Sequence, residues 1–289
     1  MRGAFHITFF YSSHRMPYLA TVLDEIARLP IETAVFVHSN RDMSSLLNRW
    51  PTARCITYGY RRIGRHFHAA LWRHLFGKRA HAAWCHRLGL TWLLHPYYLA
   101  WENRWTIARV AEEFDFQVSL EDDVVFSAAA LEYWLEHKDA ALRQAYNLGF
   151  LRTENAHGAT FVTDLTAPLR NTLETEGRTW LINDNNPYCA AWIMDRTELQ
   201  RFMASPEWHF TAQGLDIREM AAIGWHAKGM TRYRSTLLPL VRDRDGSMQV
   251  DSRCALRHLP NNYAGHAQHC TQRFPLVLDD PAREGACIS

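Results

Sequence analysis

The chain has 289 residues, of which 47% are hydrophobic and 21% are charged, so its composition is that of a globular protein and excludes a disordered or fibrous one. Its 32 Lys and Arg nearly balance its 30 Asp and Glu, and the net charge of +2 by itself indicates no class of partner.

The first sixty residues alternate between runs typical of strands and runs typical of helices. The expected strands are Phe5–Tyr11, Thr33–His38 and Ala53–Tyr58, and the expected helices are Pro17–Leu29 and Arg41–Trp50. This rhythm predicts an α/β protein with a mostly parallel sheet flanked by helices. In such sheets, ligands bind outside the carboxyl ends of the strands.

The segment from Met43 to Trp101 contains no Asp or Glu, although it holds nine Lys and Arg. Within it, residues 61–94 combine cations with aromatic and aliphatic residues, as do helices that lie on anionic membrane surfaces. A pair of core helices with an exposed basic rim is the alternative explanation. We expect no nucleic-acid partner, because no nucleic-acid-binding module accompanies the charge.

No apolar stretch reaches the roughly 20 residues that a membrane-spanning helix needs. None of the six cysteines forms a C-x-x-C pair, which argues against a structural zinc site. A disulfide framework is not expected in a chain of this length without a signal sequence. We therefore expect a cytoplasmic protein, either soluble or peripheral on the cytoplasmic face of the membrane.

The second part of the chain continues the mixture of helices and strands. We expect helices at Tyr98–Phe114, Ser127–Ala145, Arg196–Met203 and Leu215–Ile223, and strands at Phe116–Leu120, Leu148–Arg152, Ala159–Thr163 and Tyr188–Met194. The tail, residues 279–289, is expected to be unstructured.

Three consecutive carboxylates, Glu121, Asp122 and Asp123, follow the apolar strand at Phe116–Leu120 and precede another apolar run. Like charges this close repel one another, and a cation placed between them relieves the repulsion. Carboxylate oxygens suit Mg²⁺ and Mn²⁺, which proteins hold with one or two carboxylates plus substrate phosphates. A solvated acidic loop is the alternative, but a loop between two apolar runs favours a site.

The stretch Leu120-Glu121-Asp122-Asp123-Val124 resembles the DXD motif of GT-A glycosyltransferases in its Glu-Asp-Asp form. The resemblance implies one GT-A-like domain over residues 1–278, with a nucleotide-binding half at about 1–126 and an acceptor half at about 127–278. It implies that Asp123 binds Mn²⁺ or Mg²⁺, which bridges the diphosphate of the nucleotide sugar. Asp122 and Glu121 would contact the donor.

The same resemblance suggests roles for residues outside the motif. Ser12, Ser13 and Arg15 follow the first strand, where GT-A folds hold the nucleotide, and Arg61 and Arg62 are candidates to neutralise the diphosphate.

A second group of residues resembles the acceptor-side machinery of the family. Asp216 and Glu219 lie on one helical face, where an inverting enzyme places a general base, although acids at a helix start also complement its dipole. His258 resembles the late histidine that supplies a further metal ligand, although most histidines are structural.

The sequence therefore predicts an enzyme that moves a sugar from a nucleotide diphosphate donor to a hydroxyl of a glycan or lipid-linked acceptor. Two alternatives remain. One is a metal-dependent phosphoester hydrolase or nucleotidyltransferase that uses the same acids. The other is a non-catalytic sugar-binding protein of the membrane surface, for which Asp123 would have no metal.

Overall fold

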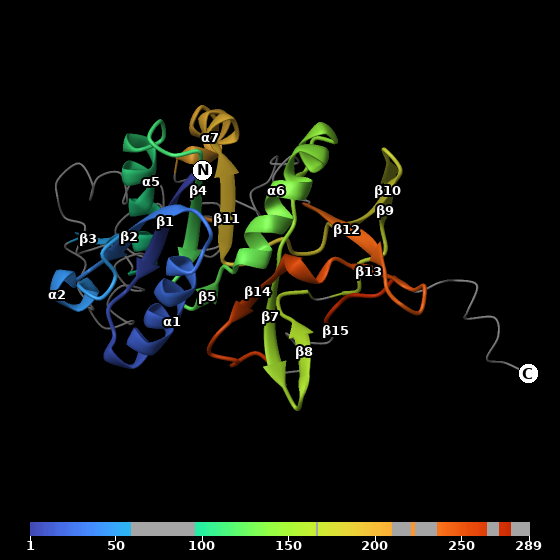
Figure 1. Ribbon diagram of the computed structural model, residues 1–289, viewed down its shortest axis with the longest axis horizontal. Helices are drawn as coiled ribbons and strands as arrows, with labels where there is room; N and C mark the ends of the chain where they lie inside the picture. Colours follow the sequence, from blue (N-terminus) through green and yellow to red (C-terminus); the bar gives the residue numbers. More distant parts are fainter. Residues whose placement is uncertain (59–95, 166, 210–220, 223–235, 265–271, 279–289) are drawn as a thin grey trace, which may run out of the picture. The chain divides into compact units, whose positions relative to one another are not determined.

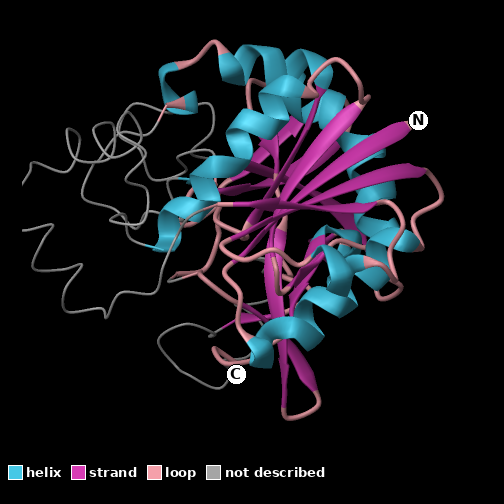
Figure 2. Ribbon diagram, turned by 90° about the vertical axis from the view of Figure 1, so that its left-hand side faces the viewer, coloured by secondary structure: helices cyan, strands magenta, loops and turns pink. Residues whose placement is uncertain are grey.

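The computed structural model describes residues 1–58, 96–165, 167–209, 221–222, 236–264 and 272–278. These residues form a mixed α/β structure with three sheets and five α-helices (Figures 1 and 2). The chain divides into two compact units. Unit 1 comprises Met1–Val124 and Ala190–Met230, and unit 2 comprises Val125–Cys189 and Thr231–Ser289.

Unit 1 is built on a five-stranded sheet in the order β11-β4-β1-β2-β3, which Figure 1 shows from β3 to β11. Its strands are β1 (Arg2–Phe9), β2 (Glu32–Ser39), β3 (Ala53–Thr57), β4 (Phe116–Glu121) and β11 (Ala191–Asp195). The first four run parallel, whereas β11 is antiparallel to β4. The expectation of a mostly parallel N-terminal sheet is confirmed.

The helices described in unit 1 are α1 (Met16–Ala27), α2 (Ser44–Leu47), α5 (Leu99–Arg109) and α7 (Arg196–Met203). In α1, the buried residues recur at the spacing of one helical face, as the sequence predicts. They are Leu19, Val22, Leu23 and Ile26. The helix α5 packs against β1 and β2, and Asp195 caps α7 by accepting a hydrogen bond from the Glu198 amide at 2.9 Å.

The helix expected at Arg41–Trp50 is shorter in the structure, where only Ser44–Leu47 (α2) is helical. Asp42 accepts hydrogen bonds from the amide and the hydroxyl of Ser44, at 2.9 Å and 2.7 Å. This local turn holds the backbone at Asp42 and Ser44 in a non-helical conformation, so the helix does not begin before Ser44.

Unit 2 contains one described helix, α6 (Ala128–Arg143), and two sheets. The first has the order β13-β12-β10-β9, with β6 also paired to β12. Its strands are β6 (Asn147–Leu148), β9 (Thr172–Thr175), β10 (Arg178–Asn183), β12 (Thr236–Arg242) and β13 (Met248–Val250). The helix packs on this sheet through Ala140 and Ala141, which join a buried cluster with Trp180 and Leu237.

The second sheet of unit 2 has the order β15-β8-β7-β14-β5. Its strands are β5 (Val124–Val125), β7 (Leu151–Ala156), β8 (Ala159–Val162), β14 (Ala255–His258) and β15 (Gln272–Arg273). The pair β7–β8 is antiparallel, whereas β7 and β14 run parallel.

The single strand expected at Leu148–Arg152 is wrong, because β6 and β7 belong to different sheets. Gly149 lies between them, and a Cβ at this residue would stand 2.6 Å from the Thr236 hydroxyl oxygen. Only glycine therefore allows the chain to pass from one sheet to the other here. The strand expected at Tyr188–Met194 begins later, at Ala191, because Ala190 has a positive φ of 58°.

A chain of neutral hydrogen-bonding groups crosses the core of unit 1. His6 and His38 are both fully buried, with 3.2 Å between His6 Nδ1 and His38 Nε2. His6 Nε2 lies 2.8 Å from the Gln117 side-chain oxygen, and His38 Nδ1 lies 3.0 Å from the Tyr58 hydroxyl. The direction Tyr58 to His38, His38 to His6, and His6 to Gln117 satisfies these three links. It uses the single proton of the Tyr58 hydroxyl, which also lies 3.2 Å from the Glu102 carbonyl oxygen.

Burial keeps both imidazoles neutral, because charging a ring away from water is costly. It lowers the pKa of His6 to about 3, against the hydrogen bond to Gln117 that raises it, and it lowers the pKa of His38 well below its usual value. The unfolded chain binds protons at these groups below about pH 6.5 and the folded chain does not. Stability is therefore lost as the pH falls from about 6.5 towards 3.

We predict that replacing one of these histidines lowers by one the number of protons that the chain takes up on unfolding at acidic pH. In urea unfolding between pH 6 and 5, the slope of unfolding free energy against pH should fall by about 1.4 kcal/mol per pH unit in His38→Gln. The wild-type protein, unfolded in urea at the same pH values, is the reference. An unchanged slope in His38→Gln would show that His38 is already protonated in the folded protein.

Candidate functional site

The sheet of unit 1 has a switch point between β1 and β4. The chain passes from β1 to β2 on one side of β1 and later places β4 on the other side. Such a switch leaves a crevice outside the carboxyl ends of the two strands, where ligands bind. Arg15 follows β1 by one turn, and Asp122 and Asp123 follow β4 directly.

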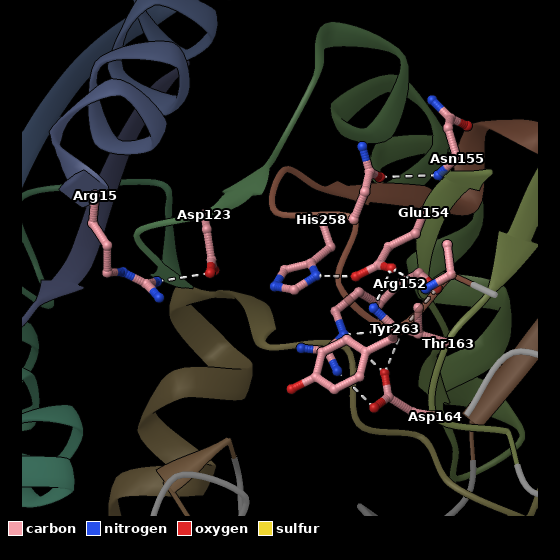
Figure 3. Close-up of polar contacts among 11 residues, drawn as sticks. Arg15, Asp123, Arg152, Glu154, Asn155, Thr163, Asp164, His258 and Tyr263 are labelled. Atoms are coloured by element: carbon pink, nitrogen blue, oxygen red, sulfur yellow. Dashed lines mark hydrogen bonds and ion pairs between the residues drawn. The ribbon is translucent and has the colours of Figure 1, made fainter. Parts of the chain in front are cut away.

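Arg15 joins the two aspartates at this edge, and Figure 3 shows its contact with Asp123. Its Nε and Nη2 donate to the two carboxylate oxygens of Asp122, both at 2.8 Å, and Nη2 also donates to Asp123 Oδ2 at 2.7 Å. Asp122 is 6% exposed and Asp123 is 3% exposed. The two acids predicted to form the site are therefore buried side by side and share one guanidinium.

Burial and the neighbouring acids both act on the protonation of Asp122. Burial raises the pKa of Asp122 to about 7, and the charges of Asp123 and Glu121 act in the same direction, against the hydrogen bonds from Arg15. Burial also opposes the charge of Arg15, but its contacts with both aspartates outweigh burial and raise its pKa. Asp122 therefore holds its proton to a much higher pH than an ordinary aspartate does.

The donor chemistry of this edge fits a divalent cation. Two adjacent carboxylates are the protein ligands that Mg²⁺ and Mn²⁺ commonly have when phosphate oxygens complete the coordination. Within the described residues, no group of three or more His, Cys, Asp or Glu is placed to hold a metal. The guanidinium of Arg15 contacts the same two carboxylates, so a cation here competes with Arg15 for them.

The remaining residues predicted after β1 and β4 lie at the same edge. Ser12 is buried, and its hydroxyl lies 2.6 Å from His14 Nδ1, whereas Ser13 is exposed. The amide of Glu121 donates to the carbonyl of Ala190 at 3.1 Å. Ala190 adopts the left-handed conformation, which is strained for a residue with a Cβ and is typical of functional sites.

The loops after β1 and β2 meet through residues that the sequence analysis missed. The Tyr11 amide donates to the Asn40 side chain at 2.7 Å, and the Arg41 guanidinium lies 4.4 Å from the centre of the Tyr11 ring. The signal in the sequence is Asn40, a polar residue directly after β2. Together these residues form an aromatic and polar surface at the same edge as Arg15.

The predicted histidine His258 ends β14 in unit 2 and is buried. Its Nδ1 bonds to a carboxylate oxygen of Glu154, which is completely buried on β7 (Figure 3). The register of the parallel strands pairs Arg257 with Thr153, so the next residue on each strand is His258 and Glu154. Glu154 was missed, because nothing in the local sequence links two residues 104 positions apart.

Arg152 lies two residues before Glu154 and therefore on the same face of β7. Its guanidinium makes two hydrogen bonds to Asp164, at 2.8 Å and 2.6 Å, and lies 5.2 Å from the centres of the Tyr188 and Tyr263 rings. Arg152 thus pairs with Asp164, while Glu154 contacts His258.

Several predicted site residues lie outside the described residues. These are the candidate bases Asp216 and Glu219, the candidate phosphate ligands Arg61 and Arg62, and the basic segment of residues 61–94. In the parts of the chain that are described, no helix combines the length and the apolar character needed to cross a membrane.

Comparison of the chain with models of known protein families gives no match, and comparison with curated proteins finds no similar one. The function is therefore argued from the site itself.

We predict that Arg15→Met destabilises the folded protein by about 3 kcal/mol, because it leaves two buried carboxylates without their shared cation. Arg15→Lys should lose less, since an ammonium keeps the charge but not the two-pronged contact. Urea unfolding of the purified variants measures both. Arg28→Met, which removes an exposed cation at the other end of α1, should cost less than about 0.5 kcal/mol. Equal losses in Arg15→Met and Arg28→Met would contradict the buried pairing.

Proposed function

We propose that the chain is a metal-dependent glycosyltransferase of the GT-A type. It moves a sugar from a nucleotide diphosphate donor to a hydroxyl of a glycan or lipid-linked acceptor. The proposal includes Mn²⁺ or Mg²⁺ as the cofactor and a cytoplasmic location. An anionic membrane surface is proposed as a partner of residues 61–94.

One observation carries the proposal: two buried aspartates end the strand next to β1 at the switch point of the sheet. Ligand sites form at this position in α/β sheets generally. Two consecutive buried acids, one of them with a raised pKa, suit a ligand that brings positive charge with it. A divalent cation bound to a diphosphate is such a ligand.

The proposed roles follow from the chemistry of each side chain. Asp123 would hold the cation, and Asp122 and Glu121 would accept hydrogen bonds from the donor; the family resemblance alone suggests His258 as a further ligand. Bound there, the cation supplies positive charge for the diphosphate leaving group.

The protein's own groups would do the rest of the work. With Asp122 and Asp123 bound to a cation, the Arg15 guanidinium would contact the phosphate oxygens of the donor instead. Its planar shape matches two of these oxygens. Ser12 and Ser13 would bind the nucleotide, and Arg61 and Arg62 the diphosphate. Asp216, with Glu219 beside it in sequence, would remove the acceptor proton if the reaction inverts configuration.

We predict that Mn²⁺ together with one nucleotide diphosphate sugar stabilises the protein. At a ligand concentration about 100-fold above Kd, a single site adds about 2.7 kcal/mol, which raises the Tm by about 5 °C. Thermal unfolding against a panel of nucleotide sugars, with and without Mn²⁺, measures this shift. The shift should vanish in Asp123→Asn and persist in Glu113→Gln, which removes an exposed acid of the same unit.

The outcome also separates the other two candidate functions. A shift with Mn²⁺ and a plain nucleotide or phosphoester, but with no sugar nucleotide, would favour the hydrolase or nucleotidyltransferase. A shift with free sugars that is independent of Mn²⁺ and of Asp123 would favour the non-catalytic sugar-binding protein.

A further inference from the structure

Arg15 contacts most of the oxygen atoms that a cation at the carboxyl edge of unit 1 would use. Its Nε and Nη2 donate to both carboxylate oxygens of Asp122 and to one of Asp123, so three of the four oxygens accept from a single guanidinium. All three residues belong to unit 1. A divalent cation needs these same oxygens, and two positive groups that share them repel each other.

The arginine is the member of this cluster that solvent reaches. Its side chain is 31% exposed, whereas the side chains of Asp122 and Asp123 are 8% and 4% exposed. Its Nη1 donates to no other residue in the described part of the chain. The guanidinium can therefore leave the carboxylates by rotation of its own side-chain bonds, and it has N–H groups with which to bind an anion.

The guanidinium loses three hydrogen bonds when it leaves the acids, so its departure is unfavourable unless another anion replaces them. A cation alone supplies a partner for the carboxylates but none for Arg15. A diphosphate supplies that second partner, because a guanidinium binds phosphate oxygens through two parallel hydrogen bonds. The cation and the diphosphate therefore each make the binding of the other more favourable.

We propose that Arg15 is an internal competitor of the divalent cation, which binds tightly at the two aspartates only when a diphosphate takes the guanidinium away from them. The inference deepens the proposed function and rests on it for the cation and the diphosphate. It adds that the two ligands bind cooperatively and that Arg15 is the residue that couples them. The competition prevents the cation from staying in the site without the donor.

The first measurement is a titration with Mn²⁺ alone, in which electron paramagnetic resonance reports the concentration of free Mn²⁺. We expect Arg15→Met to bind Mn²⁺ about tenfold more tightly than the wild type, because the competing cation is gone. Arg28→Met removes an exposed cation of the same unit and should match the wild type. Adding Asp123→Asn to Arg15→Met should abolish the gain, which would place the ion on the aspartates.

The sign of the change separates competition from a merely structural role. If Arg15 only holds the edge together, its loss loosens the site and weakens Mn²⁺ binding. Arg15→Lys provides the same test if Arg15→Met does not fold. An ammonium keeps the charge but not the two-pronged contact, so this variant should also bind Mn²⁺ more tightly than the wild type, by a smaller factor. An affinity for Mn²⁺ alone that equals or falls below that of the wild type overturns the proposal.

The second measurement is a calorimetric titration with UDP, GDP, ADP and CDP in turn, with and without Mn²⁺. The factor by which Mn²⁺ strengthens diphosphate binding should be about tenfold smaller in the Arg15 variant than in the wild type. An equal factor overturns the coupling through Arg15 but leaves the proposed function intact, because the wild type still binds both ligands. If the wild type binds Mn²⁺ neither alone nor with any of these diphosphates, the proposed function fails and the inference fails with it.

Discussion

Two buried carboxylates that share one guanidinium set the character of the carboxyl edge of unit 1. Burying Asp122 and Asp123 costs several kcal/mol each unless they are paired, and Arg15 supplies that pairing through three hydrogen bonds. The arrangement requires β1 and β4 to be neighbours, because Arg15 comes from one strand end and the acids from the other. The parallel sheet thus brings the charges together.

The same constraint operates in unit 2 with a different solution. Glu154 is buried more completely than Asp122, yet its donors match its oxygens, and Arg152 is satisfied separately by Asp164. Asp122 and Asp123 contact a charged guanidinium, whereas Glu154 accepts from two backbone amides and contacts a histidine ring. We interpret the first as a place prepared for a positively charged ligand and the second as a rigid support for His258.

The elements that the sequence predicted best are those with one dominant local signal. The apolar spacing of α1 and the apolar run of β4 each specify a buried face without help from distant residues. The errors arose where distant residues decide the conformation. Gly149 separates β6 from β7 because Thr236 and Leu238 pass close to it, and these residues come more than 80 positions later. The antiparallel pairing of β11 with β4 is likewise a contact between distant segments.

By itself, the sequence determined the α/β class and singled out Glu121-Asp122-Asp123, because acids after an apolar strand are visible in the local pattern, whereas His258 was proposed from the family resemblance. Only the tertiary structure decided that Arg15 is the cation of the two aspartates and that Glu154 is the partner of His258. The physical reason is that the energy of a buried charge depends on its partners in space. Sheet pairing brings those partners from more than 100 residues away.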